Sequence, residues 1–146
     1  MDHAYCSTQE RAVDTLEIVT GKALPYRRLK GIKEINLGRF EGESIQLQPT
    51  AAEYYETFYA DFGGETSEQV RQRMNKTLTQ VMKQEGHNHV LAVSHGGASV
   101  LFMQTFLEDR SRIALQNCSI VKCRFDGKTF RLTEVIDHDF SALETN

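Results

Sequence analysis

The stretch His89-Val90-Leu91-Ala92-Val93-Ser94-His95-Gly96-Gly97 decides how we interpret the rest of the chain. Val90–Val93 is a continuous apolar run between polar residues, which predicts a strand buried on both faces. Residues 98–107 are apolar enough to form a buried helix. This arrangement places His95 at a helix N-terminus, where free backbone N–H groups and the helix dipole favour an anion. A plain helix start with a hydrogen-bonded histidine fits the same residues, so both interpretations stay open at this point.

The composition limits the class of protein. With 146 residues, of which 40% are hydrophobic and 25% charged, the chain is typical of a soluble globular protein, and we expect residues 1–146 to form a single domain. A net charge of -3 argues against nucleic acid as a partner. No apolar run approaches the roughly 20 residues that span a bilayer, and the first residues do not resemble a signal peptide. We therefore expect a cytoplasmic protein without a membrane partner.

The three cysteines indicate neither a disulfide framework nor a metal site. Cys118 and Cys123 are five positions apart on a predicted strand, so their side chains should point to opposite faces and cannot share a metal ion. We expect all three to be buried free thiols.

Two segments carry helix signals. Ser7 followed by Glu10 predicts a capping box at the start of a helix that runs to about Thr20 and stops at Gly21. Thr66 followed by Gln69 predicts a second capping box, and this helix should end near Gly86. Apolar residues at helical spacing define its buried side, namely Val70, Met74, Leu78, Val81 and Met82. The basic residues between them are expected on the solvated face, namely Arg71, Arg73, Lys76 and Lys83.

The remaining segments predict an edge strand, a shaped loop, an aromatic helix and a hairpin. Residues 24–29 suit the edge strand, and residues 29–42 have neither strand nor helix periodicity. In that loop, Glu34 or Glu41 could act as a proton donor if it faced an anion, although solvated loop glutamates are the commoner case. Residues 50–61 are rich in Tyr and Phe, which suits a helix across a pocket mouth. Residues 120–125 and 129–136 are strand-like and are joined through Asp126-Gly127, a hairpin signal.

Four of these segments together resemble the histidine phosphatase superfamily. Residues 7–15, Ser-Thr-Gln-Glu-Arg-Ala-Val-Asp-Thr, resemble its Ser-x-x-x-Arg-Ala-x-x-Thr motif, and residues 29–42 resemble its Leu-x-Glu-Ile-x-x-Gly-x-x-Glu-Gly loop. Gly63-Gly64-Glu65-Thr66 with Arg73 resembles its Gly-Gly-Glu-Ser helix start, and Val93-Ser94-His95-Gly96-Gly97 resembles its second histidine motif. The order and approximate separations agree as well, so the resemblance covers nearly all of the chain.

The resemblance implies a three-layer α/β/α phosphoglycerate mutase-like fold and phosphoryl chemistry through a phosphohistidine. In this family one histidine attacks phosphorus, arginines and a second histidine hold the phosphoryl oxygens, and a glutamate protonates the leaving group. Carried over to this sequence, Arg11 clamps the phosphate with the backbone of Gly96, His95 is the second histidine and Glu34 is the general acid. Glu41 would support the loop. No metal or organic cofactor is implied, and the expected ligand is a small phosphorylated metabolite.

The sequence departs from the family at one decisive motif. Family members begin with a strand that ends in Arg-His-Gly and carries the nucleophile, and no Arg-His-Gly occurs in these 146 residues. The other histidines, His3, His87, His89 and His138, match no position that could replace it. We therefore expect an N-terminally truncated fold that lacks its central first strand and has no phosphohistidine catalysis. Unpaired sheet edges beside Val90–Val93 would then favour a homo-oligomer.

Three functions remain open at this stage. The first is a phosphatase of phosphate monoesters, favoured over a phosphoglycerate mutase because only 20 residues separate Gly42 from Gly63, where the mutases carry a longer insertion. The second is a phosphate-binding or protein-interaction module without catalysis. The third is a structural domain without a site, which would require four coincident motifs.

Overall fold

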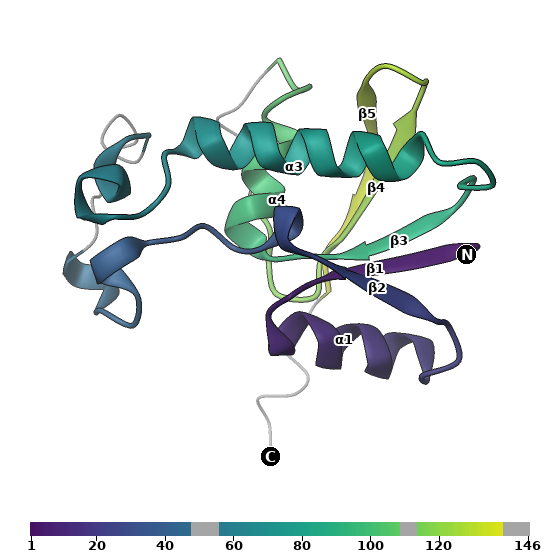
Figure 1. Cartoon of the computed structure of the whole chain (residues 1–146), viewed down its shortest axis with the longest axis horizontal. Helices are drawn as coiled ribbons and strands as arrows, with labels where there is room; N and C mark the ends of the chain where they lie inside the picture. The colour runs from purple at the N-terminus through teal and green to yellow at the C-terminus, as the bar shows by residue number, and fades with distance from the viewer. Residues whose placement is uncertain (48–55, 109–113, 139–146) are drawn as a thin grey trace.

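A computed structural model describes residues 1–47, 56–108 and 114–138 of the protein (Figure 1). In chain order its elements are β1 (His3–Ser7), α1 (Glu10–Thr20), β2 (Tyr26–Leu29), the short 3-10 turns η1 (Lys30–Ile32), η2 (Gly38–Phe40), η3 (Ile45–Leu47) and η4 (Phe58–Phe62), then α3 (Ser67–Met82), β3 (Val90–Val93), α4 (Gly96–Met103), β4 (Ile120–Phe125) and β5 (Phe130–Ile136). In Figure 1, α1 lies on one side of the sheet and α3 with α4 on the other. This is the α/β/α arrangement that the sequence predicts.

The strands form two sheets. β1 lies between β2 and β3 in a parallel three-stranded sheet, and β4 pairs with β5 in an antiparallel hairpin. Each face of the parallel sheet has its own core. On the α1 side the buried residues are Ala4, Cys6, Val13 and Leu16. The other core also includes Phe130 from the hairpin, and its buried residues are Ile32, Val70, Met74, Ala98, Leu101, Phe102 and Phe130.

The prediction that Val90–Val93 is buried on both faces is wrong. Ala92 is exposed and the other three residues are half-buried. The reason is position, because β3 is an edge strand whose second side faces no other strand in the described ranges. The short apolar run therefore reflects an edge strand with one packed neighbour, and not the centre of a sheet.

The N-cap of the first helix lies two residues after the predicted one, at Gln9 and not at Ser7. Ser7 is the last residue of β1 and pairs with Leu29 of β2, so its backbone belongs to the sheet. Gln9 is the N-cap, and its own backbone N–H donates to Ser7 Oγ at 3.2 Å. The predicted Ser7–Glu10 capping box is therefore wrong. The helix end is confirmed, since α1 runs to Thr20 and Gly21 caps it with φ 58°.

The second capping box is confirmed. Thr66 Oγ1 accepts from Gln69 N at 3.1 Å, and Gln69 Oε1 accepts from Thr66 N at 2.9 Å. The helix that follows, α3, ends at Met82, a turn before Gly86.

The apolar helix after His95 is α4. It begins at Gly96 and ends at Met103, so it lies closer to the N-terminus than the predicted helix over residues 98–107.

The hairpin connection is longer than the predicted two residues. β4 ends at Phe125 and β5 begins at Phe130. Within the connection, Asp126 Oδ1 accepts hydrogen bonds from Lys128 N and Thr129 N.

The three cysteines differ in burial. Cys6 is buried and Cys123 is half-buried, but Cys118 is exposed and precedes β4 with φ 63°. The expectation that all three thiols are buried is therefore wrong for Cys118.

The predicted aromatic helix lies partly outside the described residues. Its described end is η4, a 3-10 turn in which Tyr59 is buried and Phe58 and Phe62 contact Phe40 of η2. Within the described part of the chain, no helix is long and apolar enough to cross a bilayer.

Candidate functional site

The site lies where two parallel strands end side by side. Cys6 near the end of β1 is in register with Val93 at the end of β3, so the segments that follow both strands meet at one edge of the sheet. Ser94 Oγ donates to Ile32 O at 2.8 Å, which connects the residue after β3 to the end of η1. His95 follows in extended conformation as the N-cap of α4. Three segments thus converge on the first turn of α4.

Arg11 and His95 are in direct contact. Arg11 Nε donates to His95 Nδ1 at 3.2 Å. An arginine can only donate, so Nδ1 must be the acceptor and the proton of a neutral imidazole lies on Nε2. Burial, and then the positive charge of Arg11, hold the pKa of His95 below its ordinary value, with Glu34 opposing them. At neutral pH the imidazole is therefore an uncharged donor through Nε2.

The Glu34 carboxylate is seated on the first turn of α4. Its Oε1 accepts from Ala98 N at 2.8 Å and from Ile35 N at 2.9 Å, and its Oε2 accepts from Gly97 N at 3.2 Å. A Cβ at Gly97 would lie 2.9 Å from Glu34 Oε1, so the carboxylate needs a glycine at this position. The sequence predicted an anion at this helix start, and one of the protein's own side chains provides it.

Hydrogen-bond donors remain beside this carboxylate. The described residues offer no partner to Gly96 N–H, and none to the buried Nε2 of His95. Gly96 is exposed, but the buried Nε2–H of His95 without a partner costs about 1–3 kcal/mol, which an acceptor oxygen would offset. With the guanidinium of Arg11, these groups form a set of donors of the kind that stabilises a phosphoryl oxygen. The structure therefore brings together all four residues singled out from the sequence, namely Arg11, Glu34, His95 and Gly96.

Sequence reasoning missed residues that hold the Glu34 loop. Gln9 Oε1 accepts from Glu34 N at 2.8 Å, and nothing in the residue type distinguishes this glutamine from a solvated one. The prediction that Arg71 and Arg73 lie on a solvated face is wrong. The side chain of Arg71 is only 8% exposed and forms an ion pair with Glu56, and that of Arg73 is 21% exposed. Their charge led us to expect them in solvent, but in the structure both side chains pair with acidic residues.

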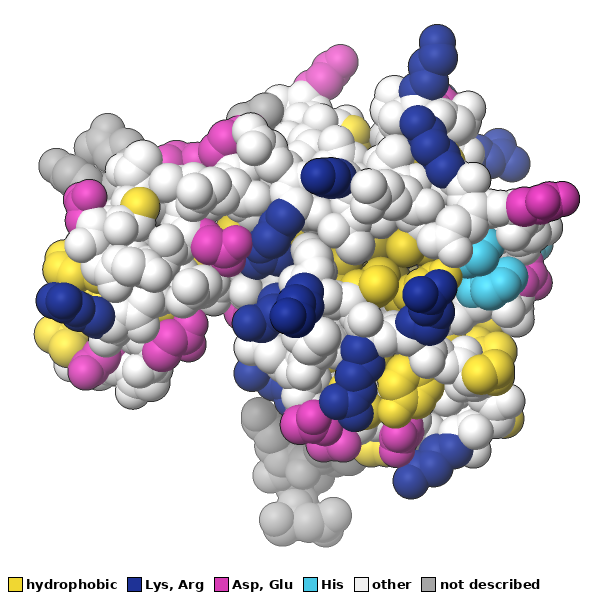
Figure 2. All heavy atoms as spheres, viewed as in Figure 1, with side chains coloured by type: hydrophobic (Ala, Val, Ile, Leu, Met, Phe, Trp, Pro, Cys, Tyr) yellow, Lys and Arg dark blue, Asp and Glu magenta, His cyan; other side chains and the backbone are white. Residues whose placement is uncertain are grey.

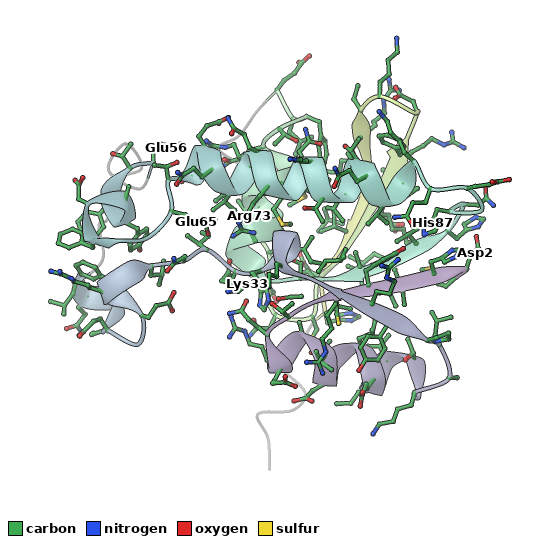
Figure 3. All side chains as sticks on the ribbon, in the orientation of Figure 1. Asp2, Lys33, Glu56, Glu65, Arg73 and His87 are labelled. Carbon is green, nitrogen blue, oxygen red and sulfur yellow. The ribbon has the colours of Figure 1, made fainter. Side chains whose placement is uncertain are left out.

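The other candidates lie away from α4. Glu41 Oε1 accepts from Leu37 N at 2.9 Å, so Glu41 braces its own loop. The ring of His3 stacks on that of His87, whose Nε2 is hydrogen-bonded to Tyr5 OH at 2.7 Å. Figure 3 shows His87 near the beginning of the chain, and histidine side chains appear at that end of the molecule in Figure 2. In the described part of the chain, no three His, Cys, Asp or Glu side chains are placed to hold a metal ion.

The surface near the loop is basic. In Figure 2, Lys and Arg side chains gather over the middle of the face, where Figure 1 shows η1 and β2. Arg11 is exposed, and so are Lys30 and Lys33. A chain of net negative charge thus presents local positive charge around the candidate site, which would attract a small anion.

Comparisons with known proteins show the family and the fold of the chain. The model of the histidine phosphatase superfamily (branch 1) matches residues 1–138. YhfR from Bacillus stearothermophilus is 28% identical with a TM-score of 0.77, and the match covers 90% of this chain and 72% of that one. A putative alpha-ribazole-5'-P phosphatase from Escherichia coli is 21% identical with a TM-score of 0.73, covering 94% and 73%. A phosphoglycerate mutase from Bacillus anthracis is 18% identical with a TM-score of 0.70, covering 92% and 72%. No curated protein sequence matches the chain.

Proposed function

The chain belongs to the histidine phosphatase superfamily, and from that premise we propose that it carries the phosphate-binding side of a phosphatase site for phosphate monoesters. The ligand is a small phosphorylated metabolite, whose phosphoryl oxygens are held by Arg11, His95 and Gly96 N–H. The phosphatase branch suits the chain better than the mutase branch, because only 20 residues separate Gly42 from Gly63.

The contact between Arg11 and His95 carries this proposal. The Arg11 Nε to His95 Nδ1 hydrogen bond, at 3.2 Å, fixes His95 as a donor through Nε2. The lowered pKa of His95, caused by burial and by Arg11, keeps it neutral, so it can donate a hydrogen bond without the cost of a buried charge. The same hydrogen bond disfavours His95 as the attacking nucleophile, because the lone pair of Nε2 is not free. His95 therefore suits the role of an oxygen holder.

Glu34 suits the role of proton donor. Its carboxylate lies next to the Gly96 N–H position along the same helix turn. In a bound phosphate monoester, this carboxyl group would lie beside the ester oxygen and could transfer a proton to the leaving group.

The nucleophile is the part that these 146 residues do not supply. Hydrolysis in this superfamily begins with attack by the histidine of an Arg-His-Gly motif, and the chain contains no such motif. We propose that the 146-residue chain binds phosphate and does not turn over phosphate monoesters. The bond from phosphorus to the ester oxygen stays intact for want of an attacking group.

Calorimetric titration with inorganic phosphate tests the binding part. We expect His95→Ala and Arg11→Gln to weaken phosphate binding by about 10-fold or more, as loss of a hydrogen bond to a charged group predicts. His89→Ala is the matched control, because His89 is an exposed histidine at the opposite end of β3. Equal affinities in the wild-type chain and both site variants would refute the proposal, and so would a normal turnover rate of the 146-residue chain on p-nitrophenyl phosphate.

A phosphate-binding module without catalysis is the second candidate, and the missing Arg-His-Gly favours it. The two functions differ when a strand ending in Arg-His-Gly is placed ahead of the chain. A phosphatase site should then hydrolyse p-nitrophenyl phosphate, and should lose that activity in the His95→Ala variant. A pure binding module should remain inactive in both forms.

A further inference from the structure

Every N–H group of the Arg73 guanidinium donates a hydrogen bond, either to the segment that carries Glu34 or to the carboxylate of Glu65. Nη1 donates to Gly31 O at 3.0 Å and to Lys33 O at 2.8 Å, and Nη2 donates to Glu34 O at 3.0 Å. Nε and Nη2 donate to the two carboxylate oxygens of Glu65 at 2.7 and 2.9 Å. Figure 3 shows Arg73 and Glu65 beneath α3, above the segment that holds Lys33. One side chain therefore binds three backbone carbonyls, that of Gly31 in η1 and those of Lys33 and Glu34 in the segment that follows.

Glu65 grips the same loop from its other end. Glu65 N donates to Asn36 O at 2.8 Å, and Asn36 N donates to Glu65 Oε2 at 3.0 Å. Burial opposes ionisation of Glu65, but the Arg73 guanidinium and the Asn36 N–H together hold its pKa below the ordinary value. The Glu65–Arg73 pair is thus a charged clamp that spans residues 31–36 and encloses the backbone of Glu34.

We propose that Arg73 is a positioning residue of the phosphate site, which holds the Glu34 carboxylate against the first turn of α4. The inference rests on the proposed function of that site. The Glu34 backbone is fixed at its N–H by Gln9 and at its carbonyl by Arg73, so the side chain reaches Gly97 N and Ala98 N from a set origin. Release of the carbonyl would let the carboxylate leave α4.

If Arg73 positions the Glu34 carboxylate beside a bound phosphate, replacing Arg73 should change phosphate affinity in a direction that a purely structural role would not. The charged groups around Glu34 are Arg11 from α1, Lys33 beside it, and Arg73 with Glu65 on the side of α3, and the neutral imidazole of His95 lies at the start of α4. A fixed carboxylate next to a phosphate position lowers phosphate affinity, because like charges repel. Loosening the clamp should therefore tighten phosphate binding, whereas general damage to the fold should weaken it.

The chain offers a matched control two residues away on the same helix. Arg71 also uses its whole guanidinium, on Glu56, Glu68 and Gln104, and its side chain is 8% exposed. Gln104 caps the C-terminal end of α4, and among the described residues no hydrogen bond joins Arg71 to residues 31–36. Arg71→Lys and Arg73→Lys both keep the positive charge and lose the planar fork.

The experiment compares these two variants by two measurements. In calorimetry with inorganic phosphate, Arg73→Lys should bind about threefold or more tightly than wild type, and Arg71→Lys should not bind more tightly. In native-state amide exchange, Arg73→Lys should lose protection at Gly97 and Ala98, and Arg71→Lys should retain it. In a Glu34→Gln background, Arg73→Lys should no longer tighten binding. Weaker binding in Arg73→Lys with unchanged protection at both amides would overturn the inference.

Two provisions keep the test decisive. If Arg73→Lys does not fold, Glu65→Gln weakens the same clamp and should shift both measurements in the same direction by a smaller amount. If the wild-type chain binds no phosphate, the proposed function fails, and amide exchange alone decides the positioning role. Retained protection of Gly97 and Ala98 in the clamp variants would then overturn it, and lost protection would support it.

Discussion

Alanine at position 97 should destabilise the protein, whereas alanine at the neighbouring position 96 should stabilise it. Both glycines lie in the first turn of α4 and neither has a positive φ, so each replacement gains about 0.5–1 kcal/mol from helix propensity. Nothing lies within 4 Å of a Cβ at Gly96. At Gly97 the Cβ would lie 2.9 Å from Glu34 Oε1 and 3.0 Å from Ile35 Cδ1. The two variants therefore differ in whether the new methyl group meets the Glu34 carboxylate and the end of the Ile35 side chain.

The expected difference follows from the hydrogen bonds that must give way. To accommodate the methyl group, Glu34 must leave Gly97 N and Ala98 N, and each hydrogen bond to a charged group contributes about 1.5–3 kcal/mol. Glu34 is half-buried, so water offsets part of this loss. We expect Gly97→Ala to be less stable than Gly96→Ala by about 2–4 kcal/mol.

Urea unfolding followed by circular dichroism measures this difference. The same pair of variants in a Glu34→Gln background provides a control, because the uncharged side chain should reduce the gap between them. A Gly97→Ala protein as stable as the Gly96→Ala protein would show that the carboxylate is not seated on α4, and the account of the site would fail with it.

Three further predictions concern titration, thiol reactivity and assembly. Because burial and Arg11 hold the pKa of His95 below its ordinary 6.5, the unfolded chain binds a proton that the folded chain excludes. Unfolding free energy should therefore fall as the pH drops below about 6.5, and a His95→Asn variant with an unchanged slope would contradict this. Burial raises the pKa of the Cys123 thiol to about 11 and also raises the pKa of Cys6. A thiol reagent at pH 8 should therefore label the exposed Cys118 first. Equal labelling rates of the three thiols would be inconsistent with the fold. The free side of edge strand β3 should support self-association, which sedimentation at rising concentration would detect and which Ala92→Lys should suppress; a strictly monomeric wild type would refute it.

Two similar capping signals show where local sequence succeeds and fails. Thr66 with Gln69 forms the predicted box because the backbone before it is free to adopt the cap conformation. Ser7 with Glu10 does not, because Ser7 is already paired with Leu29 in the sheet. A local pattern therefore predicts a helix start only where no strand claims the cap residue, and pairing between distant strands is not visible in a local pattern.

The candidate site shows a similar division. The motif resemblance predicted that Arg11, Glu34, His95 and Gly96 share one site. The structure places them around the first turn of α4. The motif resemblance included Glu65 and Arg73, but it did not predict what Arg73 binds, because three of its partners are backbone carbonyls. Every residue has such a carbonyl, so only the path of the loop makes these three available.

The central place of β1 in the sheet bears on the order in which the protein folds. β1 pairs on one side with β2, which follows closely in the chain, but on the other side with β3, and Asp2 and His89 at that junction are 87 positions apart. Closing such a long loop costs entropy before any contact compensates for it, so the β1–β3 pairing should form late and slowly. During synthesis one side of β1 stays open until β3 has left the ribosome. The α1 layer can assemble early, but the phosphate site lies at the β1–β3 junction and can form only after these two strands have paired.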